Sequence, residues 1–193
     1  FMTLSPVEQY MVQTGKRLFR GFDDYSDVHR LQFDIETTGL DPKVNSTFLI
    51  GIKDNRGFEE VIRVSGDTPR ELRESEIKAT QYFLKLVKEL EPDIISGYNS
   101  EVFDFNFLNK RCERLGYEMK DFGGTLNDDK PIYFRKNATI KLGAETEYYD
   151  QTIMWGFNVI DIAHAVRKAQ AINSSIKGWG LKYITKFSDV AKP

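Results

Sequence analysis

The sequence predicts an α/β fold in which an antiparallel meander of strands is continued by parallel strands and flanked by helices. Three observations predict it. Three short apolar runs come first, two amphipathic helical patterns follow, and another short apolar run lies between the two helices. The chain has 193 residues, which suits one domain with a small appendage. We expect residues 1–25 to form an N-terminal lead-in and residues 26–193 to form the domain.

The expected meander consists of three short strands. They cover residues 31–36, 47–53 and 58–64. The tetrapeptide Asp54-Asn55-Arg56-Gly57 separates the second strand from the third. Because Asn and Gly tolerate positive φ, these two strands should form a hairpin. The lead-in should hold a short strand or turn among its polar residues.

Helices are expected to follow the meander. Thr68-Pro69 should begin the first helix, since proline favours the early helical positions, and Pro92 lies just beyond its end. A buried strand at 93–96 precedes a second helix at 103–115, which Gly116 should close. The remaining elements are a β-hairpin at 133–150, a strand at 158–161, and helices at about 162–171 and 178–187.

Composition and charge narrow the classes of function. The net charge of −2 argues against a large basic surface for gripping duplex DNA. It does not exclude nucleic acid, because carboxylates that bind metals concentrate negative charge, and the bound metals invert the local field. The single Cys112 excludes an internal disulfide and a cysteine-rich zinc site. With no apolar run near the length of a membrane span, we expect an intracellular, cytoplasmic protein with a prokaryotic or viral parent.

Asp34 and Glu36 stand two residues apart on the first expected strand. Strand alternation should place both side chains on the same face, near the carboxyl end, where α/β proteins tend to bind ligands. Two carboxylates this close repel each other, so they require a cation or a proton. Their hard oxygen atoms suit Mg²⁺ or Mn²⁺. On these two residues alone, a solvated pair on a half-exposed strand is the alternative.

Two segments resemble the motifs of a known family. The run from Asp34 to Leu40, Asp-Ile-Glu-Thr-Thr-Gly-Leu, is similar to the first exonuclease motif of the DEDD nucleases. The run from Tyr98 to Leu108, Tyr-Asn-x-x-x-Phe-Asp-x-x-x-Leu, is similar to their second motif. Residues 19–22, 30–33 and 179–187 resemble family B DNA polymerases. The resemblance implies a ribonuclease H-like mixed sheet and the proofreading 3′→5′ exonuclease domain of such a polymerase.

The resemblance also implies a set of site residues and cofactors. In that family four carboxylates hold two divalent ions, Mg²⁺ or Mn²⁺, and hydrolyse the 3′-terminal phosphodiester of single-stranded DNA. By motif, Asp34 would bridge both ions, Glu36 would bind the water-activating ion, and Asp104 would hold the other. A carboxylate favoured at a helix N-terminus is the alternative for Asp104. The residues implied to contact the single strand are Thr37, Thr38, Gly39, Leu40, Asn99 and Phe103.

The family's third motif, Tyr-x-x-x-Asp or His-x-x-x-x-Asp, carries the fourth carboxylate and is absent from its place in this sequence. Tyr117 and Asp121 match the spacing, but they directly follow the helix of the second motif. We expect the fourth carboxylate to lie beyond Pro193 in a longer parent with a polymerase domain, so that this chain alone is a poor exonuclease. A free-standing DEDD exonuclease on DNA or RNA and a nucleic-acid-binding domain without activity stay open. Asp161 should cap the helix that follows it.

Overall fold

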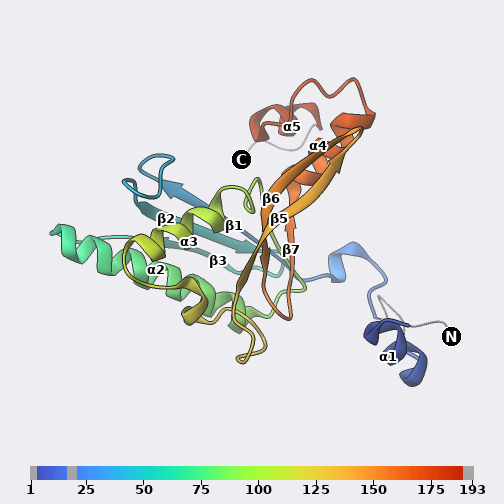
Figure 1. The fold of residues 1–193 in the computed structure, drawn as a ribbon, viewed down its shortest axis with the longest axis horizontal. Helices are drawn as coiled ribbons and strands as arrows, with labels where there is room; N and C mark the ends of the chain where they lie inside the picture. Colours follow the sequence, from blue (N-terminus) through green and yellow to red (C-terminus); the bar gives the residue numbers. More distant parts are fainter. Residues whose placement is uncertain (1–3, 17–20, 189–193) are drawn as a thin grey trace.

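A five-stranded mixed sheet forms the centre of the protein, whose computed structural model describes residues 4–16 and 21–188 (Figure 1). The strand order is β3-β2-β1-β4-β7. Strand β1 pairs antiparallel with β2 and parallel with β4, and β7 continues the parallel part. The predicted meander with parallel strands is therefore confirmed. The strands are β1 (Arg30–Thr37), β2 (Thr47–Asp54), β3 (Glu59–Arg63), β4 (Ile94–Gly97) and β7 (Asn158–Asp161).

The turn between β2 and β3 lies where the sequence predicted it. One oxygen of Asp54 accepts the backbone N–H of Arg56 at 2.8 Å and that of Phe58 at 2.7 Å. Gly57 has a φ of 102°, which residues with a side chain rarely adopt. The same Asp54 accepts a hydrogen bond across a buried contact from His29, at 2.7 Å. The turn is therefore tied to the start of β1.

Two helices cover one face of the sheet and form the core with it. They are α2 (Pro69–Leu90) and α3 (Asp104–Arg114). Phe33 of β1 packs between Phe83 of α2 and Phe105 of α3, at ring-centroid distances of 4.8 and 4.7 Å. Helix α2 begins at a capping box formed by Thr68 and Glu71, as its Thr-Pro start suggested. The core thus packs against one face of β1, and the polar side chains of β1 lie on the other face.

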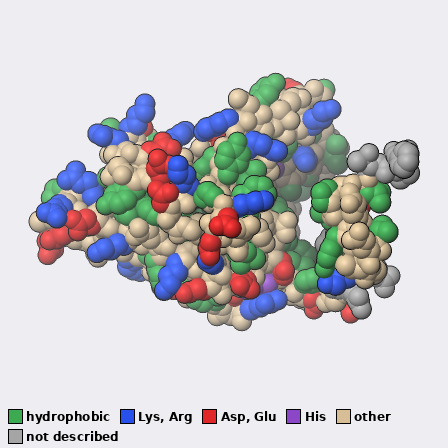
Figure 2. All heavy atoms as spheres, turned by 60° about the horizontal axis from the view of Figure 1, so that its bottom comes forward, with side chains coloured by type: hydrophobic (Ala, Val, Ile, Leu, Met, Phe, Trp, Pro, Cys, Tyr) green, Lys and Arg blue, Asp and Glu red, His purple; other side chains and the backbone are tan. Residues whose placement is uncertain are grey.

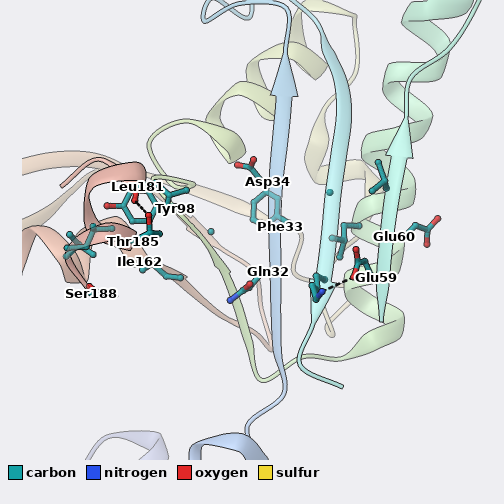
Figure 3. A pocket seen from close by; sticks show the side chains of 17 residues that line it. Gln32, Phe33, Asp34, Glu59, Glu60, Tyr98, Ile162, Leu181, Thr185 and Ser188 are labelled. Carbon is teal, nitrogen blue, oxygen red and sulfur yellow. Dashed lines mark hydrogen bonds and ion pairs between the residues drawn. The ribbon is translucent and has the colours of Figure 1, made fainter. Parts of the chain in front are cut away.

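The opposite face of the sheet meets a second group of elements. Helices α4 (Ile162–Ile172) and α5 (Leu181–Phe187) follow β7 and line, together with β1 to β3, a pocket of about 750 Å³ (Figure 3). The hairpin of β5 (Tyr133–Leu142) and β6 (Glu145–Ile153) forms a separate two-stranded sheet beside α4. Short 3₁₀ turns lie at Tyr25–Asp27 and Met119–Phe122.

Residues 6–14 of the lead-in form a helix, so the prediction of a short strand or turn is wrong for this part. Residues 1–3 and 17–20, on which the prediction also rested, lie outside the described residues. Helix α1 (Pro6–Thr14) begins at Ser5, whose side chain forms a capping box with Glu8, and ends at Gly15 in the left-handed conformation. These local signals outweigh the weak apolar pattern on which the prediction was based. Helix α1 buries none of its side chains and lies apart from the sheet (Figure 1).

The surface agrees with the small net charge. On the face shown in Figure 2, basic and acidic side chains alternate, and they do not gather into one large basic surface. Among the helices of the described ranges, none is long and apolar enough to cross a membrane.

Candidate active site

Asp34 and Glu36 lie on the face of β1 that points away from the core. Leu31, Phe33 and Ile35 are buried against the helices, and the residues between them are exposed. The alternation therefore places both carboxylates on one face, as predicted. Figure 3 shows Asp34 and Gln32 projecting from β1 toward the side of the pocket formed by Tyr98 and Leu181.

Asp104, which is 69 residues away from Ile35 in the sequence, contacts the same strand. It is the first residue of α3, and its side chain is buried, with 3% exposure. Its Oδ1 accepts the backbone N–H of Ile35 at 3.1 Å. Because Ile35 lies between Asp34 and Glu36, this hydrogen bond holds the third predicted carboxylate against the strand segment that carries the other two.

The carboxylates oppose one another's ionisation. The pKa of Asp104 is raised to about 7, first by burial and then by the charge of Asp34. Partial desolvation raises the pKa of Asp34, and the charge of Glu36 raises it further. Such mutual repulsion is relieved by a proton or by a cation. Perturbed carboxylates of this kind are concentrated at functional sites.

The three carboxylates fit a divalent ion in the chemistry of their donors. Mg²⁺ and Mn²⁺ prefer hard oxygen ligands, and Asp34, Glu36 and Asp104 supply only such ligands. Over residues 4–16 and 21–188, however, no three His, Cys, Asp or Glu side chains are arranged so that they could hold one metal ion. The assignment of these residues as metal ligands therefore stays a prediction.

The first motif continues through Thr37, the last residue of β1, into the loop residues Thr38, Gly39 and Leu40. Thr37 donates its hydroxyl to the carbonyl of Gly39 at 2.9 Å. A Cβ at Gly39 would lie 2.7 Å from the end of the Asn45 side chain, so a larger residue there would displace the amide that accepts the N–H of Asp41. Leu40 is 81% exposed. A large apolar side chain presented to solvent on a loop tied by hydrogen bonds is suited to contact a ligand.

Asp161 holds the loop that carries Asn99 and leads to Asp104. The backbone N–H of Asn99 donates to Asp161 Oδ1 at 2.8 Å, and that of Glu101 donates to Oδ2 at 3.1 Å. Asp161 also caps α4 by accepting the N–H of Ala163 at 2.9 Å, which confirms the predicted cap. Asn99 has a φ of 64°, so this loop turns sharply. Phe103, half-buried, follows on the same loop.

The comparison with protein families decides the membership of this chain. The model of the RNase H superfamily matches residues 31–191, which contain all five strands of the sheet except Arg30, and all three carboxylates. The chain belongs to the RNase H superfamily. The fold class predicted from the sequence is that of this superfamily and is confirmed.

The relatives of this RNase H superfamily domain include DNA polymerases. The DNA polymerase of Thermococcus kodakarensis is 31% identical over 113 residues, which are 56% of this chain and 7% of that protein. The DNA polymerase of Archaeoglobus fulgidus is 31% identical over 133 residues, 67% of this chain and 15% of that protein. The solved family B DNA polymerase of Pyrobaculum calidifontis shares the fold, with a TM-score of 0.56 and 22% identity over 86% of this chain and 19% of its own. The resemblance seen in the motifs is thereby confirmed.

Glu101, in the loop of the RNase H superfamily domain that leads to Asp104, is a buried acid that sequence reasoning missed. Glu101 is 3% exposed, and its Oε1 accepts the N–H of Thr152 in β6 at 3.0 Å. Its Oε2 lies 3.7 Å from Nδ1 of His164 on α4. The pKa of Glu101 is raised to about 7, chiefly by burial. A glutamate in a loop is ordinarily solvated, so the sequence contained no signal for this burial.

Proposed function

We propose that this domain is a proofreading 3′→5′ exonuclease of a family B DNA polymerase, acting on the 3′ end of single-stranded DNA. The observation that carries the proposal is the hydrogen bond from Ile35 to the buried Asp104, which joins the second motif to the strand of the first. The relatives named DNA polymerase support the context. The chain spans a fifth or less of the relatives it matches, so the polymerase domain is a proposed partner in the parent chain.

Each site residue has a proposed role in the reaction. Two divalent ions, Mg²⁺ or Mn²⁺, supply water activation and stabilisation of the leaving 3′ oxygen when bound. Asp34, Glu36 and Asp104 would hold them, since their repulsion favours a cation between them. Near pH 7 the raised pKa of Asp104 leaves this group partly protonated, so it must lose its proton before it acts as a ligand.

The strand-binding roles follow from the two loops beside the carboxylates. Leu40 would pack against the terminal base, and the backbone from Thr37 to Gly39 would contact the terminal nucleotide. Phe103 would stack on a base of the strand, with Asn99 beside it, and stacking of this kind tolerates any base. A site of this composition would act on single strands with little sequence preference.

The decisive experiment follows the length of a 5′-labelled single-stranded oligonucleotide with Mg²⁺ present, with this chain and with a longer parent chain. Shortening from the 3′ end is expected with the parent, and Asp34→Ala should slow it by about a thousandfold or more. Asp129→Ala, at an exposed loop position, is the matched control. Activity that persists in Asp34→Ala or after chelation would refute the proposal. Binding without any shortening by either chain would favour the inactive nucleic-acid-binding reading.

A further inference from the structure

A buried ion pair joins the two core helices beneath the loop that follows β1. Glu76 of α2 is 3% exposed and Arg111 of α3 is 9% exposed. Nε of Arg111 lies 2.9 Å from Oε1 of Glu76 and 3.0 Å from Oε2. Neither residue belongs to the two motifs, and neither lines the pocket that contains Asp34.

Both members of the pair also bind the loop. Nη2 of Arg111 donates to Oγ of Ser46 at 2.9 Å, and Nη1 reaches the carbonyl of Pro42 at 3.5 Å. Oε1 of Glu76 accepts the backbone N–H of Thr47 at 2.8 Å. The pair therefore contacts the loop at its middle and at its return to the sheet.

Inside the loop, hydrogen bonds connect Ser46 to Thr38 of the first motif. The N–H of Thr38 donates to the carbonyl of Ser46 at 2.9 Å, and the N–H of Ser46 donates to the hydroxyl of Thr38 at 3.0 Å. Thr47 is the strand partner of Thr37, across an irregularity in the register that follows Glu36. Displacement of Ser46 or Thr47 would therefore move Thr37 and Thr38, which lie directly after the predicted metal ligand Glu36.

Net stabilisation alone does not explain a buried ion pair. Removing two charges from water costs about as much as their attraction returns, and well-packed apolar residues in their place are often neutral or stabilising. An apolar pair would, however, lose the hydrogen bonds to Pro42, Ser46 and Thr47 of the loop. The chemistry of this pair therefore suits the placing of a backbone segment, because the flat guanidinium offers several donors in fixed directions.

We infer that Glu76 and Arg111 are positioning residues that set the loop from Thr37 to Leu40 against the 3′-terminal nucleotide. The inference rests on the proposed function, in which that loop contacts the terminal nucleotide. It adds a determinant of binding that lies on the buried side of the loop, away from the substrate. Its effect should be confined to the terminal nucleotide, since the loop carrying Asn99 and Phe103 is held separately by Asp161.

The test compares Arg111→Lys with wild type and with Arg70→Lys. Lysine keeps the positive charge beside Glu76, but it lacks the planar fork in which three separate nitrogens contact Glu76, Pro42 and Ser46. Arg70 forms an exposed ion pair with Glu74 on the same helix α2, at 2.8 Å, and is the matched control. The probe is a single-stranded oligonucleotide with 2-aminopurine at its 3′ end and a phosphorothioate at the terminal linkage, which slows cleavage. A second oligonucleotide carries the fluorophore at an internal position.

Arg111→Lys should accelerate hydrogen exchange at the amides of residues 38–47 by about tenfold or more, with exchange in β4 unchanged. Its Kd for the oligonucleotide should rise about tenfold, and the loss of fluorescence response should appear at the 3′-terminal position and not at the internal one. Arg70→Lys should match wild type. Should Arg111→Lys fail to fold, the apolar double variant E76M/R111M takes its place in the same two measurements. It removes both buried charges together and so leaves neither charge unpaired.

The outcomes distinguish a failure of the positioning role from a failure of the proposed function. A variant with a loosened loop that binds the 3′-terminal base as wild type does would overturn the positioning role and leave the proposed function intact. Unchanged exchange in the loop would overturn it as well. If the wild-type chain shows no response with either oligonucleotide, the proposed function and the positioning role fall together.

Discussion

The protonation state of Asp104 is central to the candidate site. Its carboxyl group is buried and bonded to the N–H of Ile35, yet it stands near the charge of Asp34. Burial and like charge both oppose ionisation, and the pKa is therefore raised to about 7. A bound divalent cation would remove both penalties. Binding of such a cation near neutral pH should thus release protons from the site.

The variant Asp104→Asn tests this residue directly. The amide oxygen of asparagine can still accept the N–H of Ile35, so the fold should persist, but the charge that attracts a cation is lost. We expect the affinity for Mn²⁺ to fall about tenfold or more, as measured by titration calorimetry. Asp129→Asn, at an exposed loop position, should bind as wild type does. Equal affinities of Asp104→Asn and wild type would contradict a ligand role for Asp104.

Glu101 should make stability depend on pH. Its pKa in the folded chain is about 7, against an ordinary value of 4.5, so the folded state holds the proton more tightly than the unfolded state. Burial of the group is then harmless below pH 4.5, and its cost grows as pH rises to about 7. The full cost is on the order of 3–4 kcal/mol, since one pKa unit corresponds to about 1.4 kcal/mol.

Glu101→Gln should remove this dependence, because glutamine can still accept the N–H of Thr152 but cannot ionise. In urea unfolding, the variant should gain free energy of unfolding relative to wild type between pH 4.5 and pH 8. The difference between the two proteins is the quantity to compare, since the titration of Asp104 is common to both. A difference that stays constant across this range would show that Glu101 titrates as an ordinary solvated glutamate.

At the scale of elements, Asp161 connects three parts of the fold. It ends β7, caps α4 and accepts two N–H groups of the loop between β4 and α3. In Asp161→Asn one of these N–H donors would face an amide nitrogen, and the remaining bonds would lose a charged acceptor. We expect the free energy of unfolding to fall by roughly 2–4 kcal/mol, since a hydrogen bond to a charged group contributes about 1.5–3 kcal/mol. Urea unfolding measures this loss, and a change as small as that of the exposed Asp129→Asn would contradict the connecting role.

The parts of the fold that the sequence predicted well are those set by local patterns. Alternation along β1 placed Asp34 and Glu36 on one face, and the Thr68-Pro69 start and Gly116 end marked α2 and α3. The residues that were missed act over long sequence distances. Glu101 meets Thr152, and Glu76 meets Arg111, only after the sheet has formed. Helix α1 is a different kind of error, because its capping residues Ser5 and Glu8 were present in the sequence and were outweighed by a weak apolar pattern.

At the scale of the whole molecule, the division between lead-in and domain can be tested by truncation. Helix α1 buries no side chain, whereas the later lead-in residues Phe22 to Tyr25 line a pocket of about 960 Å³ with β4 and β7. Stability comes mainly from buried apolar contacts, so removal of residues 1–16 should change the free energy of unfolding by less than about 1 kcal/mol. Removal of residues 1–25 should cost more, because it also removes the backbone carbonyl and the ring of Tyr25, which contact the side chain of Arg30 at the start of β1. Thermal unfolding of the two truncated chains measures both effects. If the shorter truncation is as harmful as the longer one, α1 belongs to the domain, and the boundary after residue 25 is wrong.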